Sequence, residues 1–412
     1  MIPDFFKLHN HVKHYEWGSP EWIPRLVGQV NSEGRPWAEF WMGAHPGSPS
    51  LVFLDEKEIP LGELIAGNPR YYLGEQAAKQ YNGLPFLFKL LAAEKTLSIQ
   101  VHPNLSQARE GFERENRMGI APDAPNRNYK DVNHKPEIIC ALPCEQGTPF
   151  TGMCGFREPD EIRRLLEEFL APSAALQEGC APLLRALDSD GSAAGRPAVL
   201  RNFLNALFNL SPAVREELTA HIRRGWPGSD TMLMELMLHF AELYPHDPAL
   251  LSPLYLNVFN LQPGEAVYLG AGTPHAYIHG FGVELMANSD NVLRGGLSPK
   301  HIDVPELTRV LDFRPMKPEI IRPDFAPQSC FTYPAPCGEF SLSVIHGAGE
   351  TAFSKCGPAI CVLTAGELVM QGGKDKAVLT SGESVFIPAG GNEGKPLLLR
   401  GNYTLYVASL PQ

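Results

Sequence analysis

Apolar residues recur along the chain with two different spacings, and the change from one to the other divides the sequence. Up to about residue 155 the apolar runs are short and are separated by turn-forming residues, as at 51–54 and 138–142. Runs of this length between turn signals predict β-strands. We therefore expect an antiparallel β domain over the first part of the chain.

The spacing becomes helical between about residues 157 and 255. Apolar residues separated by three or four positions predict an amphipathic helix, and this set is Ile162, Leu165, Leu166, Phe169 and Leu170. Two more helices are expected over 199–208 and 232–243. Between them, Ser211 and Pro212 supply the polar cap and first-turn proline that open a helix. The stretch is predicted to be an all-helical insertion.

Strand-like residues return at about 256, and one stretch there resembles a later one. Residues 264–272 align without gaps with residues 382–390, at a constant offset of 118. We interpret this as a repeated strand-and-turn unit. The alternative is that any strand leading into a glycine turn has similar residues, because turn residues recur for local reasons. The first copy continues to His275, whereas the second has Glu393 at the aligned position. If both copies belong to barrels, only the first is expected to bind metal.

The first copy also fits the spacing of the second cupin motif, with Gly270 where proline is usual. Cupins are small double-sheet jelly-roll barrels. The predicted fold is therefore mainly β with an α-helical insertion, built on cupin-type jelly-roll β-barrels. We expect a catalytic domain of residues 1–156 and 256–322, an insertion of 157–255, and a C-terminal cupin-like domain of 323–412 without metal ligands.

Composition limits the partners of the chain. Its 412 residues, 44% of them hydrophobic, allow two or three domains. The formal charge of −11 argues against nonspecific nucleic-acid binding. No apolar run is long enough for a membrane span, and the first residues lack the features of a secretory signal. The eight cysteines form no Cys-x-x-Cys pair, so a thiolate zinc site is disfavoured. We expect a cytoplasmic protein.

Four polar residues form a candidate metal site. Gln100 and His102 alternate on a predicted strand and therefore point to one face. Glu137 precedes the apolar strand 138–142, and His275 follows the cupin-like glycines. Taken singly, the histidine on a strand more often satisfies a hydrogen bond, and the Glu137 segment also fits a surface turn. Together they form a nitrogen and oxygen site suited to zinc, but also to manganese, cobalt or iron.

At these residues the sequence closely resembles the type I mannose-6-phosphate isomerases. Six blocks follow the order of that family, and they occupy residues 14–19, 38–46, 84–91, 97–103, 133–137 and most of 272–300. The resemblance covers most of 14–156 and 256–304. The helical insertion and the C-terminal module match the family only in their general pattern of residue types.

The resemblance implies one zinc ion per chain, bound by Gln100, His102, Glu137 and His275. It also implies the interconversion of mannose 6-phosphate and fructose 6-phosphate in carbohydrate metabolism, in mannose breakdown or in GDP-mannose biosynthesis. We expect a monomer. The substrate pocket would include ten residues: Trp17, Glu39, Lys89, Ser98, Lys135, Tyr277, Glu284, Asp290, Arg294 and Lys300.

Aldose–ketose isomerisation moves a proton between neighbouring carbons through an enediolate. The developing negative oxygen needs an electrophile, which zinc and Arg294 can supply. His134, Glu284 and Asp290 are unranked candidates for the proton carrier, and Lys135 is placed to hold oxygens or lower a neighbouring pKa. Glu284 has an alternative interpretation as an organising ion pair with Arg294.

A phosphate end of the substrate requires cations in this acidic protein. Lys89, Ser98 and Lys300, together with Arg294, supply three cations and a hydroxyl for charge-assisted hydrogen bonds. Two other functions remain open. One is a metal cupin of another reaction class, such as an iron oxygenase. The other is a protein that binds sugar phosphates without turning them over.

Overall fold

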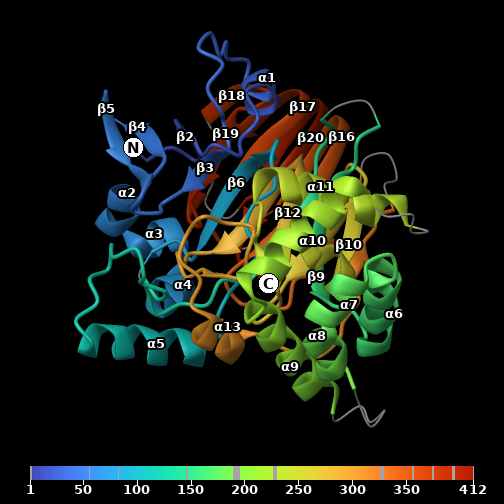
Figure 1. The fold of residues 1–412 in the computed structure, drawn as a ribbon. Coiled ribbons are helices and arrows are strands. Elements are labelled where there is room, and N and C mark those ends of the chain that lie inside the picture. Colours follow the sequence, from blue (N-terminus) through green and yellow to red (C-terminus); the bar gives the residue numbers. More distant parts are fainter. Residues whose placement is uncertain are drawn as a thin grey trace.

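Two large β-sheets organise the chain in the computed structural model. It describes residues 2–54, 56–81, 83–144, 147–188, 195–225, 230–324, 329–354, 357–373, 375–391 and 395–411. Glu393, the residue that replaces the aligned histidine in the second repeat, lies outside this part. Figure 1 shows the C-terminal strands in the upper part of the view, helices α6 to α9 at the lower right, and α2 to α5 at the left.

Among the described residues the first sheet has eleven strands, with the central order β14-β11-β8-β12-β6-β3-β2. These strands are β2 (His11–Lys13), β3 (Glu39–Gly43), β6 (Phe86–Ala93), β7 (Gln100–Val101), β8 (Glu137–Ala141), β9 (Phe150–Phe156), β10 (Leu256–Leu261), β11 (Ala266–Leu269), β12 (His275–Ala287), β13 (Leu293–Arg294) and β14 (Ile320–Ile321). A separate hairpin joins β4 (Leu51–Leu54) to β5 (Lys57–Pro60).

The second sheet has seven strands among the described residues, in the order β1-β19-β17-β20-β16-β15 with β18 beside β17. These are β1 (Phe6–Lys7), β15 (Cys330–Tyr333), β16 (Ser341–Phe353), β17 (Ala359–Gly372), β18 (Asp375–Thr380), β19 (Ser384–Ile387) and β20 (Leu397–Ser409). The N-terminal strand β1 thus pairs within the C-terminal sheet. One apolar core, which includes Phe88 and Phe386, joins the two sheets.

Helices connect and cover the first sheet. Before the predicted insertion they are α1 (Trp22–Leu26), α2 (Leu61–Gly67), α3 (Pro69–Leu73), α4 (Glu75–Gln80) and α5 (Leu105–Arg117). From there onward they are α6 (Pro159–Leu170), α7 (Ala174–Gly179), α8 (Ala181–Ala186), α9 (Arg196–Phe208), α10 (Pro212–Arg224), α11 (Thr231–Leu243), η1 (Pro248–Leu251), α12 (Ser252–Tyr255) and α13 (Val304–Val310). None of the described helices has the length and apolarity to cross a lipid bilayer.

The predicted helices between 157 and 255 are confirmed as helices. All five apolar residues of the first one are buried in α6, and the Ser211 hydroxyl caps α10 by accepting from Val214 N. The helical core is continuous with that of the first sheet, because Phe169 belongs to the same apolar cluster as Val101 and Ala276. The helices therefore support the strands that carry the candidate site.

The strand-and-turn repeat is also confirmed. Strands β11 and β19 have identical bounds once the offset of 118 is applied, and each leads to a strand of 13 residues, β12 or β20. The turns before them have the same backbone conformation, since φ is 89° at Gly264 and 87° at Gly382. The strand predicted over 97–103 is shorter than expected, because only Gln100–Val101 pairs as a strand.

The turn at Gly382 gives a test of this architecture. A side chain there would be strained by the positive φ, and its Cβ would also lie 2.4 Å from Val27 Cα. Gly349 has a similar φ of 91° with nothing within 4 Å of a Cβ. We expect Gly349→Ala to cost about 1–2 kcal/mol, and Gly382→Ala to cost more. Urea unfolding of both variants measures this, and an equal loss would contradict the packing at Gly382.

Candidate metal centre

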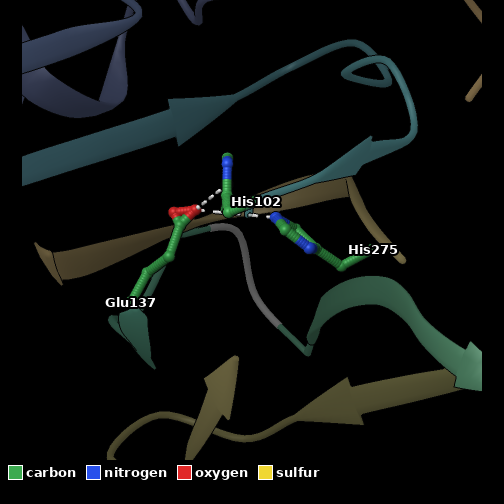
Figure 2. A group of neighbouring side chains, drawn as sticks. All are labelled: His102, Glu137 and His275. Atoms are coloured by element: carbon green, nitrogen blue, oxygen red, sulfur yellow. Dashed lines mark hydrogen bonds and ion pairs between the residues drawn. The ribbon is translucent and has the colours of Figure 1, made fainter. Parts of the chain in front are cut away.

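Three of the four predicted metal ligands meet in the interior of the first sheet. Glu137 opens β8, His275 opens β12, and His102 follows β7. Their exposed fractions are 2%, 4% and 1%. Figure 2 shows both imidazoles directed at the Glu137 carboxylate, with His102 Nε2 2.9 Å and His275 Nε2 3.5 Å from its Oε1.

This geometry fits a metal ion. One ligand atom from each residue lies within 4.8 Å of the other two, and ligands about 2.0–2.1 Å from a tetrahedral zinc would be about 3.3 Å apart. The second ring nitrogens face backbone carbonyls, since His102 Nδ1 is 2.7 Å from Asn291 O and His275 Nδ1 is 2.9 Å from Thr273 O. Each Nδ1 therefore carries the proton and donates it, which leaves both Nε2 lone pairs free for a metal.

Gln100 lies beside these three residues. It pairs with His275 across β7 and β12 and lines the same cavity as Glu137 and His275. Ile99 and Val101 are buried in the apolar core behind it, as the alternation predicted. Gln100 thus occupies the position expected of a fourth ligand, and that role stays a prediction.

Charge keeps the ligands in the form that binds metal. Burial alone would raise the pKa of Glu137, but the opposing effects, led by the Lys135 ammonium 3.2 Å away, hold this pKa well below its usual range. Burial, assisted by Lys135, lowers the pKa of His102 to about 4. At neutral pH the site therefore offers a carboxylate and a neutral imidazole.

A thiol next to the site is not a ligand of this kind. Cys154 pairs in register with His275, and burial raises the pKa of its thiol to about 12. Among the described residues, the potential ligand atoms that cluster here come from His102, Glu137 and His275, and the Cys154 sulfur is not one of them. The donors at this centre are nitrogen and oxygen.

A second polar layer lines the cavity beyond the metal ligands. Lys89 Nζ lies 2.8 Å from Glu284 and 3.4 Å from Glu39, and Trp41 Nε1 donates to Glu39 at 2.7 Å. Burial would lower the pKa of Lys89, but Glu284 and then Glu39 raise it. The organising partner of Glu284 is therefore Lys89. Tyr277 is buried and also lines the cavity, and burial, followed by the charges of Glu284 and Glu137, raises the pKa of its hydroxyl.

The basic residues predicted for a phosphate separate into two places. Lys89 is engaged by two carboxylates inside the cavity, as described above. Arg294 and Lys300 are not among the residues that line the cavity, and burial, followed by the charges of Arg294 and Lys130, lowers the pKa of Lys300. Burial likewise lowers the pKa of Arg294. Ser98 is half-buried two residues before Gln100. Sequence reasoning missed Lys130, although it closely precedes the 133–137 block.

Three other predicted residues are not among those that line the cavity. The Nε2 of His134 contacts Glu339 at 2.8 Å. Asp290 faces His45 Nε2 at 3.5 Å, and sequence reasoning missed this histidine. Trp17 stacks on Tyr15 with ring centroids 5.6 Å apart.

The fold and the centre define a class of protein: a mainly β metal-site protein whose cavity combines nitrogen and oxygen ligands with buried acid and base groups. A family model described as phosphomannose isomerase type I, catalytic domain, matches residues 5–159.

Relatives extend the match over nearly the whole chain. Mannose-6-phosphate isomerase of Escherichia coli strain K12 is 39% identical over 401 residues, which is 96% of this chain and 97% of the relative. The enzyme of Rattus norvegicus is 34% identical, covering 84% and 83% of the two chains. A solved zinc-bound mannose 6-phosphate isomerase superposes with a TM-score of 0.88 at 37% identity, covering 99% and 100%. The chain belongs to the type I phosphomannose isomerase family, and it is an isomerase.

The buried ion pair of Lys89 gives a test of the second layer. Lys89→Met leaves Glu284 and Glu39 buried without their cation, which we expect to cost about 3–5 kcal/mol. The control is Lys79→Met, because Lys79 also contacts a carboxylate at 2.8 Å but lies on the surface, where such a pair contributes about 0–1 kcal/mol. Urea unfolding at pH 7 compares the two. Equal losses would show that burial of the Lys89 pair carries no special cost.

Proposed function

We propose that this protein is a zinc-dependent aldose–ketose isomerase that interconverts mannose 6-phosphate and fructose 6-phosphate through an enediolate. The observation that carries the proposal is the buried cluster of His102, Glu137 and His275, adjoining the Lys89 and Glu284 pair in one cavity. Relatives named as mannose-6-phosphate isomerases over most of the chain support the substrate.

His102, Glu137 and His275 would hold one zinc ion per chain, with Gln100 as the fourth ligand. The zinc-bound relative supports the choice of this metal. When bound, zinc supplies a Lewis acid that polarises substrate oxygens and stabilises negative charge as it develops on them. Lys135, within 3.5 Å of both His102 Nε2 and Glu137, is placed to donate to an oxygen in the same space.

The remaining residues divide the work of binding and proton transfer. Lys300 and Ser98 bind the phosphate end, whereas Arg294, which pairs with Gln100 between β13 and β7, supplies positive charge near the developing anion. A base removes the proton from C2 as the C–H electron pair forms the enediolate and the carbonyl oxygen becomes negative. The proton then returns to C1, while the C2 hydroxyl gives its proton to O1 and the carbonyl forms at C2. Of the candidate bases, Glu284 lines the cavity, which favours it over His134.

The proposal includes the finer architecture. We place the first sheet and the C-terminal sheet in two cupin-type jelly-roll barrels, divided at 1–156 with 256–322, 157–255 and 323–412. The matching bounds and turn geometry of β11 and β19 support related barrels. We further propose a monomer that acts in the cytoplasm.

An isomerase assay tests the function. Purified protein supplied with zinc should convert mannose 6-phosphate to fructose 6-phosphate, and a chelator should abolish the conversion until zinc is restored. Absence of product in the zinc-loaded protein, with mannose 6-phosphate bound, would favour a binding protein instead. Bound iron with oxygen consumption would favour an oxygenase.

Substitution of Arg294 tests whether this residue acts in catalysis or in metal binding. Arg294→Ala should lower kcat by about a hundred-fold or more, because it removes a fixed positive charge near the developing anion, while zinc content stays at one per chain. Lys317→Ala is the control, since Lys317 is an exposed cation in the same acidic protein. Retained turnover in Arg294→Ala would remove this residue from the catalytic group, and loss of zinc would assign it to the metal site.

A further inference from the structure

Asn291 lies in the turn between β12 and β13 and has an exposed fraction of 0%. It is neither a proposed ligand nor a residue that lines the cavity. Its side chain nevertheless makes more hydrogen bonds than a packing role requires. These bonds connect two segments that both lead to the metal centre.

Both ends of the Asn291 amide are used. Its Oδ1 accepts from Lys130 N at 2.7 Å and from Asp131 N at 3.2 Å. Its Nδ2 donates to Asp131 O at 2.9 Å and to Asn133 O at 2.8 Å. The side chain therefore clasps residues 130–133, which continue directly into Lys135 and Glu137. Only an amide supplies two acceptor positions and two donor hydrogens at one site.

The backbone of the same residue contacts a metal ligand. Asn291 O accepts the Nδ1 proton of His102 at 2.7 Å, which sets the orientation of that imidazole. Three residues further on, Arg294 pairs with Gln100 between β13 and β7. Asn291 thus lies where the segments of His102, Glu137 and Gln100 are tied together.

Loss of the amide would release this arrangement. Alanine removes the side-chain partner of Lys130 N, Asp131 N and Asp131 O, whereas Asn133 O keeps the Ser289 hydroxyl as a donor. A buried group left without any partner costs about 1–3 kcal/mol. Movement of the turn then separates Asn291 O from His102. Groups that orient metal ligands from outside typically change metal affinity by about 10–100-fold when they are altered.

We propose that Asn291 is a positioning residue: it fixes the His102 imidazole relative to the 130–137 segment and thereby sets the affinity of the site for zinc. This inference rests on the proposed function, because it assumes that zinc is the metal. It assigns no contact between Asn291 and substrate.

The test is the zinc dissociation constant, measured by competition with a chromophoric chelator, for wild type, Asn291→Ala and Asn291→Asp. Asn291→Ala should bind zinc about 10–100-fold more weakly. Asn291→Asp keeps the acceptor for the two N–H groups but loses the donor, so its affinity should fall between the other two. It is also the deciding variant if Asn291→Ala does not fold.

Asn288→Ala is the matched control. Asn288 belongs to the same turn, and its Nδ2 donates to Leu84 O at 2.6 Å, away from His102. It should lower the melting temperature of the metal-free protein without weakening zinc binding. Wild-type zinc affinity in both Asn291 variants, or an equal weakening in Asn288→Ala, would overturn the inference. Failure of the wild-type protein itself to bind zinc would instead overturn the proposed function.

Discussion

The burial of the Glu137 carboxylate is the constraint on which the site depends. A carboxylate with 2% exposure is stable only where other charges and hydrogen-bond donors replace water. Here the Lys135 ammonium compensates the charge from 3.2 Å, and the Nε2 atoms of His102 and His275 lie beside the same carboxylate. A carboxylate and two imidazole lone pairs directed at one point would be stabilised further by a divalent cation between them, so burial of the charge and metal binding have one structural origin.

Strand β12 supplies residues to both the metal centre and the second polar layer of the cavity. His275 and Tyr277 share one face by alternation, whereas Glu284 should face the opposite way. All three line the same cavity, because the pairing with β9 shifts between Tyr277 and His279 and Gly280 follows with φ of 138°. An irregularity of this kind resets the alternation of a strand. One strand thus serves both the metal centre and the Lys89 layer, and the helices of the insertion pack behind it.

Sequence reasoning succeeded where local spacing determines geometry. The period of α6, the cap at Ser211 and the alternation of Ile99 and Val101 are local properties, and the structure confirms them. Sequence reasoning was less successful where the pairing of strands distant in the sequence determines which side chains meet. The sequence does not reveal that Lys89 neutralises Glu284 across β6 and β12.

Residues outside the matched motifs were harder to find. Lys130 becomes part of a basic group only because the fold brings it close to Lys300. Asn291 lies within a matched block, but its role depends on hydrogen bonds to residues 130–133.

The most direct test of the account is X-ray absorption at the zinc edge of the zinc-loaded protein. It should show only nitrogen and oxygen ligands at about 2.0–2.2 Å, with the scattering of two imidazoles. A sulfur shell at about 2.3 Å, or two imidazoles that persist in His275→Ala, would contradict it.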